Sequence, residues 1–148
     1  MRNLSAAAAF LVTVWLGASA LAQDKPNFTG TWQLDGSKSE FHNVKLADAT
    51  WSIQEGDNSI HITESEGGKS KKLELKCTTD GKDCEASDKA KASFWFNGPL
   101  LVEMETRGDH VIRYRFKISE DGKSLRVELT HIVPQLDGMD VLVFGKQT

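Results

Sequence analysis

Phe28-Thr29-Gly30-Thr31-Trp32-Gln33-Leu34 is the stretch of sequence that decides the fold. Its residues alternate as in an extended strand, so Gly30 and Trp32 share one face. The stretch begins six residues after a predicted signal-peptide cleavage site, and we therefore expect it to open the mature chain. Short alternating segments and glycine turns follow it to the C-terminus, which is typical of a small antiparallel β-barrel.

Residues 1–22 have the parts of a signal peptide. Arg2 gives a positive head, Ala6 to Leu16 form an apolar run broken only by Thr13, and Ala20-Leu21-Ala22 is an A-x-A cleavage signal. The run is too short and alanine-rich for a membrane span, although a retained anchor is the alternative. We expect one secreted or periplasmic domain at residues 23–148, with no membrane span after signal removal and a monomer as the simplest state.

The charge pattern makes nucleic acid an unsuitable partner. The whole chain has a formal net charge of −3 at pH 7, with charges of both signs scattered along it. Lys69, Lys71 and Lys72 form the only basic cluster, and we interpret it as the solvated start of a strand. A mildly acidic protein without a basic stripe lacks the electrostatic footprint of a nucleic-acid binder.

Turn signals divide the chain after residue 50 into short segments in which apolar and polar residues alternate. About ten strands in meander order close most simply when the last pairs with the first. We predict an all-β fold, a single antiparallel meander barrel of about 8–10 strands. A solidly packed interior or a two-sheet sandwich is the alternative. The turn signals are Glu55-Gly56-Asp57-Asn58, Gly67-Gly68, Asp80-Gly81, Asn97-Gly98-Pro99, Gly108-Asp109, Asp121-Gly122 and Asp137-Gly138.

One face of these strands is apolar and is predicted to line the interior as core or as a ligand cavity. Trp95 and Leu101 are expected to point outward, and acidic residues to lie on outward faces or in turns. The predicted lining residues are Trp51, Ile53, Ile62, Leu75, Phe94, Phe96, Met104, Tyr114, Phe116, Val127, Leu129 and His131.

Residues 35–48 break the alternation. Phe41, Val44 and Leu46 there are expected to form a short helical or irregular cover over one mouth of the barrel, with Ser37 or Ser39 as a cap.

The two cysteines, Cys77 and Cys84, are predicted to form a disulfide in an exported chain. They are symmetric about Asp80-Gly81, so we expect them to face each other across a hairpin. A structural disulfide is favoured over a redox switch.

The opening stretch, followed by Ser37-Lys38 and Phe41, resembles the start of fatty-acid-binding proteins, and Gly30-x-Trp32 resembles the lipocalin signature. Both families belong to the calycin group of closed barrels, and the whole chain also resembles exported bacterial proteins that open in this way. The resemblance implies that Gly30 and Trp32 close one end of the barrel, packed near a cation from the last strand. Lys146 is the best-placed candidate, with Arg126 behind it.

The last strand departs from the fatty-acid-binding pattern. Residues 141–146, Val-Leu-Val-Phe-Gly-Lys, lack the Arg-x-Tyr pair with which that family grips a ligand carboxylate. The resemblance therefore supports the architecture and weakens fatty-acid specificity.

These features predict an exported lipocalin-like barrel that binds a small hydrophobic molecule in its interior. We see no nucleophile motif, nucleotide loop or metal-ligand spacing, so we predict no enzyme, metal or cofactor. One alternative is a cell-envelope interaction protein with a packed interior, which uses Trp95 and Leu101. The other is a haem-binding, nitrobindin-like barrel that uses His131.

Overall fold

The computed structural model describes residues 25–68 and 72–148, which form ten β-strands and one short 3₁₀ helix, η1 (Gly36–Lys38). The predicted signal peptide and two lysines of the basic cluster, Lys69 and Lys71, lie outside the described residues. The strands are β1 (Gly30–Leu34), β2 (Ala49–Glu55), β3 (Ser59–Glu66), β4 (Lys72–Thr78), β5 (Asp80–Glu85), β6 (Lys91–Asn97), β7 (Leu100–Arg107), β8 (His110–Ile118), β9 (Ser124–Val133) and β10 (Asp140–Lys146).

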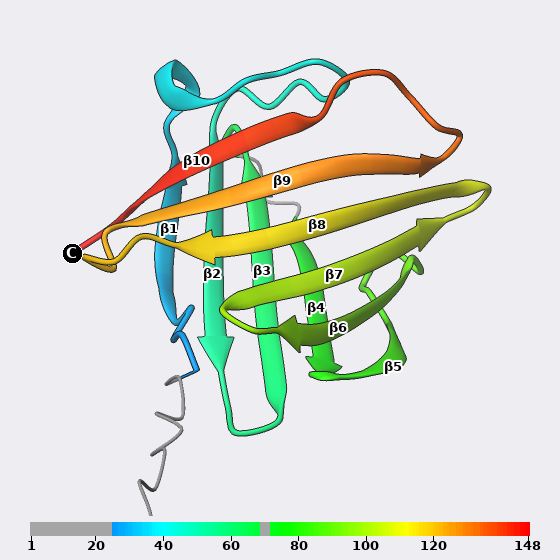
Figure 1. Cartoon of the computed structure of the whole chain (residues 1–148), viewed down its shortest axis with the longest axis horizontal. Helices are drawn as coiled ribbons and strands as arrows, with labels where there is room; N and C mark the ends of the chain where they lie inside the picture. The colour runs from blue at the N-terminus through cyan, green and yellow to red at the C-terminus, as the bar shows by residue number, and fades with distance from the viewer. Residues whose placement is uncertain (1–24, 69–71) are drawn as a thin grey trace, which may run out of the picture.

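The strands form one antiparallel sheet in the order β4-β3-β2-β1-β10-β9-β8-β7-β6-β5. The last strand pairs with the first, with Trp32 opposite Lys146 and Leu34 opposite Phe144. In Figure 1, β1 to β4 stand upright and β6 to β10 cross them, so that the sheet curls round on itself. The predicted all-β meander barrel is confirmed, and the two edge strands, β4 and β5, leave it nearly closed.

A seam separates β4 from β5. The Ser87 N–H donates to the Glu74 carbonyl (2.9 Å), and the Glu74 N–H donates to Ser87 Oγ (3.0 Å). At the other end of the seam Cys77 and Cys84 form the predicted disulfide, with their Cα atoms 5.5 Å apart. These contacts join the two strands that stand at opposite ends of the sheet order.

The predicted hairpin around this disulfide is wrong, because Asp80 begins a strand that pairs with β6, opposite Trp95. The Asp80 carboxylate accepts hydrogen bonds from Thr78 Oγ1 (2.6 Å) and from the Lys82 N–H (3.2 Å). This local turn carries the chain across the seam instead of folding it back onto β4. The cysteines therefore join two sheet edges, not the two arms of a hairpin.

Trp32 and Phe28 fill the end of the barrel at which the chain enters. Both side chains are fully buried, and the Trp32 indole N–H donates to the Phe28 carbonyl (3.0 Å). The Phe28 ring lies 6.3 Å from the Phe96 ring and 6.5 Å from the Phe116 ring, centroid to centroid. Aromatic side chains thus block this end.

Lys146 lies where the family resemblance expects a cation. Its Nζ is 5.4 Å from the centroid of the Trp32 ring. Gly30 makes this approach possible, because a Cβ atom at that position would lie 2.7 Å from Lys146 Cε. The glycine, the tryptophan and the lysine therefore form one packing unit at the closed end.

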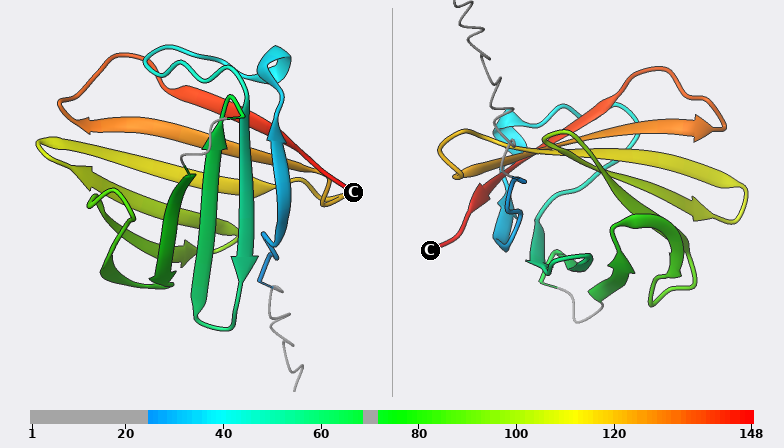
Figure 2. Two further views of the ribbon diagram at one scale, coloured as in Figure 1. Left: turned by 180° about the vertical axis from the view of Figure 1, so that it is seen from behind. Right: turned by 60° about the horizontal axis from the view of Figure 1, so that its bottom comes forward.

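Residues 35–48 run over the opposite end of the barrel (Figure 2). Asp35 caps η1 by accepting a hydrogen bond from the Ser37 N–H (3.1 Å), the role predicted for Ser37 or Ser39. Glu40 then forms an antiparallel backbone bridge with Val141 of β10, and Val141 is buried. Val44 and Leu46 pack against the buried core as predicted for an irregular cover, whereas Phe41 is exposed.

Asp140 attaches this cover to the barrel. The side chain is fully buried, and its Oδ1 accepts hydrogen bonds from the backbone N–H groups of His42 (2.6 Å), Asn43 (2.8 Å) and Val44 (3.1 Å). Burial raises the pKa of Asp140, but these donors outweigh it and bring the pKa below its ordinary value.

Asp140→Asn is expected to lower the free energy of unfolding at pH 7 by about 1–3 kcal/mol, because the charged acceptor of three N–H groups is lost. A depressed folded-state pKa gives stability that is present above the unfolded pKa of about 4 and is lost as the pH falls through the folded value. The deficit should therefore vanish in acid. Urea unfolding at several pH values measures it, with the exposed Asp137→Asn as control; a deficit independent of pH would show that the charge is not its cause.

Candidate functional site

The predicted interior residues, apart from Met104, are buried or packed against the buried core. Toward the closed end they fill the barrel with side chains. The Trp51 ring lies 4.5 Å from the Phe144 ring and 6.0 Å from the Phe116 ring, centroid to centroid. Part of the predicted cavity wall is therefore a solid core, and open space lies toward the covered mouth.

The prediction for β7 is wrong by one residue. Met104 lies opposite Ser93 and Arg113 on the outer face, whereas Leu101 is fully buried opposite Phe96. The two-residue loop Gly98-Pro99 places Asn97 opposite Leu100, and this register turns the odd-numbered residues of β7 inward. Leu101 is thus unavailable for the outward partner surface that we considered from the sequence.

The same register brings two acidic residues into the barrel, against the expectation that acidic side chains point outward. Glu103 is 2% exposed and lies between Phe94 of β6 and Tyr114 of β8. Glu105 is 6% exposed and lies between Ala92 and Ile112. The hydropathy pattern did not indicate that these two glutamates point inward. The lengths of the turns on either side of β7 could have indicated it.

A third carboxyl, Glu64, faces the interior from β3. It lies in one row with Trp51 of β2 and Leu73 of β4, and it is half-buried. These three residues line a pocket of about 690 Å³ at the covered mouth. The other lining residues are Leu46, Ala49, Ser65, Glu66, Ser87 and Asp88, which come from the cover, the strand ends and the seam.

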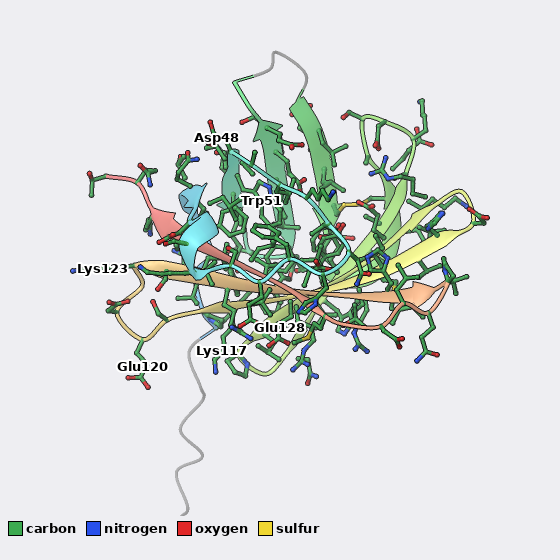
Figure 3. All side chains as sticks on the ribbon, turned by 90° about the horizontal axis from the view of Figure 1, so that it is seen from above. Asp48, Trp51, Lys117, Glu120, Lys123 and Glu128 are labelled. Carbon is green, nitrogen blue, oxygen red and sulfur yellow. A yellow bond between two sulfur atoms is a disulfide. The ribbon has the colours of Figure 1, made fainter. Side chains whose placement is uncertain are left out.

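Viewed from above, Trp51 lies between the two halves of the sheet beside the cover, while Lys117, Glu120 and Lys123 project from the periphery (Figure 3). A second, more open hollow of about 680 Å³ surrounds the disulfide at the far end of the seam. Strand tips and exposed lysines such as Lys76 and Lys82 form its walls, in place of the predicted lining residues. The mouth pocket is therefore the candidate site.

Burial and mutual repulsion dominate the electrostatics of the three carboxyls. Burial raises the pKa of Glu64 to about 8; the Glu105 charge adds to this and Arg107 opposes it. Burial raises the pKa of Glu103 well above its ordinary value, with Glu64 and Glu105 adding to the effect. Burial also raises the pKa of Glu105. At neutral pH Glu64, which lines the pocket, therefore holds its proton, whereas a glutamate in water is ionised.

Arg107 is the cation beside this cluster in the described part of the chain. Its guanidinium pairs with Asp88 and, at 3.3 Å, with Glu105 Oε1. Burial and the charges of the three glutamates raise the pKa of Tyr114 well above its ordinary value, so the phenol stays protonated as a donor.

His131 lies on the inner face of β9, opposite Ile112, and is 8% exposed. Both ring nitrogens are buried without a hydrogen-bond partner among residues 25–68 and 72–148. Those residues contain no group of three or more His, Cys, Asp or Glu that could hold a metal ion.

Comparison with known proteins finds several solved structures that share this fold. Neither a scan of family models nor a search of curated proteins finds a match for the chain. The wild-type fluorescent protein UnaG aligns with a TM-score of 0.58 and 18% identity over 81% of this chain and 97% of its own. Fatty-acid-binding protein 1 of Echinococcus granulosus aligns with a TM-score of 0.60 and 13% identity over 82% and 98%.

A secretary abundant heat soluble protein of Ramazzottius varieornatus aligns with a TM-score of 0.63 and 13% identity over 81% of this chain and 95% of its own. With ten antiparallel strands in a nearly closed meander, the chain has the calycin-type barrel fold that its opening residues predict. At these identities the likeness concerns the fold alone.

Glu64→Gln is expected to stabilise the protein in a pH-dependent way. A folded-state pKa above the unfolded value costs stability as the pH rises from about 4.5 to about 8, after which the cost is constant. Allowing for solvent screening of a half-buried group, the variant should gain about 1–3 kcal/mol over wild type at pH 8 and nothing at pH 4. Thermal or urea unfolding measures the gain. Glu66→Gln, exposed on the same strand, is the control, and an equal gain there would contradict burial as the cause.

Proposed function

We propose that this chain is an exported, lipocalin-like barrel that binds a small hydrophobic molecule in the mouth pocket. The observation that carries the proposal is the pocket of about 690 Å³ in which the apolar inner face continues beyond the solid core. Trp51 and Leu73 form its wall, and Leu46 closes it from the cover. A volume of this size suits a small organic ligand.

The similar structures support a binding role. Two of them are, by name, a fatty-acid-binding protein and a fatty acid transporter, REP1-NXSQ. Affinity would come mainly from removing apolar surface from water, at about 25 cal/mol per Å². We propose binding without catalysis, because the two serine hydroxyls that line the pocket are bonded to the backbone: Ser65 Oγ donates to the Thr50 carbonyl, and Ser87 Oγ accepts from the Glu74 N–H.

Residues 1–22 and the Cys77–Cys84 disulfide support export, because disulfides persist in oxidising compartments. Within residues 25–68 and 72–148, no helix has the length and hydropathy that crossing a membrane requires.

Titration with an uncharged fluorescent probe, N-phenyl-1-naphthylamine, tests the proposal. We expect saturable binding at one site per chain. Leu46→Asn should weaken it about tenfold, because the apolar contact of one leucine is worth about 1.5 kcal/mol.

Leu136→Asn is the matched control, since Leu136 is exposed and lies outside the pocket. It should leave the affinity unchanged. The proposal would be overturned if the probe failed to bind saturably and native mass spectrometry of the purified protein showed no retained apolar molecule.

A further inference from the structure

We propose that the mouth pocket selects a hydrophobic ligand with a cationic head group, such as a protonated amine, and that Glu64, backed by Glu103 and Glu105, holds the head. This inference rests on the proposed binding function and names the class of ligand. The inference is based on the polar side chains inside the barrel, because a site for a purely apolar ligand would not require them.

The three carboxyls face the barrel interior from two strands that are not neighbours in the sheet. Glu64 comes from β3, whereas Glu103 and Glu105 come from β7. The charge of Glu105 raises the pKa of Glu64, and the charges of Glu64 and Glu105 raise the pKa of Glu103. Glu64 itself lines the pocket, so its carboxyl is within reach of a bound molecule. The pocket thus has the carboxyl group of Glu64 at the end of an apolar wall, and this group can become negatively charged.

Among the described residues, Glu64 and Glu103 form no ion pair, and Arg107 is committed to Asp88 and Glu105. A ligand cation would supply the countercharge that these carboxyls lack. Attraction between opposite charges is stronger in a desolvated site than in water, so the head group would contribute to selectivity as well as to orientation.

His131 gives an independent sign of a missing polar partner. It is on the same inner face, in the row that runs from Glu105 through Ile112, and within the described ranges neither of its ring nitrogens has a hydrogen bond. An imidazole has two ring nitrogens, each of which can take part in a hydrogen bond. The interior beside Glu105 therefore holds a further polar side chain whose hydrogen-bonding groups are not satisfied by the described residues.

The same arrangement disfavours a fatty acid. A ligand carboxylate would add negative charge beside three buried acidic groups. Among the described residues the nearby cation, Arg107, already pairs with Asp88 and Glu105. The last strand also has no arginine on it to receive a carboxylate, since residues 140–146 read Asp-Val-Leu-Val-Phe-Gly-Lys.

Binding of a cation should release protons. Glu64 keeps its proton in the empty pocket near neutral pH, and an ammonium ion beside it favours the ionised form. The titratable groups that line the pocket are Glu64 and Glu66 of β3 and Asp88 at the seam. Glu103, Glu105, Tyr114 and His131 lie in the barrel interior, and Arg107 pairs with Asp88 and Glu105. Amine affinity should therefore rise between about pH 6 and pH 8 while the amine stays charged.

Three ligands with one tail and different heads provide the test: decylamine, 1-decanol and decanoate, each measured by calorimetry at pH 7.5 below its aggregation limit. We expect decylamine to bind at least tenfold more tightly than 1-decanol, and decanoate to bind most weakly. Calorimetry in buffers of different ionisation enthalpy should show proton release with decylamine and none with 1-decanol.

Glu64→Gln should lower the decylamine affinity at least tenfold and remove most of the proton release, and it should lower the 1-decanol affinity far less, because a neutral hydroxyl forms no ion pair with Glu64. Glu120→Gln is the control of equal charge change, because Glu120 is exposed and projects from the periphery. Thermal unfolding shows that each variant is folded, and binding of 1-decanol reports mainly on the apolar wall of the pocket.

The outcomes separate the two proposals. Failure of all three ligands to bind would overturn the proposed function. Binding in which decanoate or 1-decanol equals or exceeds decylamine would overturn the cationic head group alone, as would a decylamine preference that Glu64→Gln leaves intact.

Discussion

The structure depends on the pairing of β10 with β1, which sets Lys146 opposite Trp32 and bends one sheet into a barrel. Without that ladder the apolar face would lie open to water along ten strands. With it, β4 and β5 remain as the edges of the sheet, and Ser87 and the Cys77–Cys84 disulfide join them. Sheet edges with free N–H and C=O groups attract other strands, so the seam contacts also protect the chain from self-association.

Closure makes the two ends of the barrel different. At the entry end, Phe28, Trp32 and Phe116 fill the interior, and the cation on Trp32 needs the bare backbone of Gly30. At the other end, Asp140 holds an irregular cover instead of a plug. A carboxylate with three backbone donors is a strong but local anchor, so the cover is fixed at residues 42–44 while Leu46 lies over open space. The pocket lies between the aromatic side chains of the core and the cover.

Much of this arrangement could be predicted from the sequence, and the exceptions have physical reasons. Period-two alternation placed most of the inner wall correctly because apolar and polar residues alternate cleanly on β2, β8 and β9. On β7 residues of both faces are at least partly buried. Apolar residues therefore occur on both faces, and hydropathy alone assigned Met104 to the interior instead of Glu103. The loops Gly98-Pro99 and Gly108-Asp109 each have two residues, and together they require Glu103 to lie between Phe94 and Tyr114. No such local signal exists for Asp140, whose partners are 96 to 98 residues away, or for the seam, because a separation of seven residues between cysteines suits a hairpin as well.

The folded barrel is less stable because of three interior acids, Glu64, Glu103 and Glu105. Their pKa values are raised because burial disfavours the charged form, and apolar or amide side chains at these positions would fold at least as well. Residues that break the local pattern without stabilising the fold concentrate at functional sites, where stability is traded for binding. Here one of the three, Glu64, lines the pocket that the apolar wall enters, and the interior also holds a histidine whose ring nitrogens have no partner in the part of the chain that the structure describes. The energetic cost of the interior acids is therefore an argument that the barrel is complete only when something polar, and of opposite charge, lies inside its mouth.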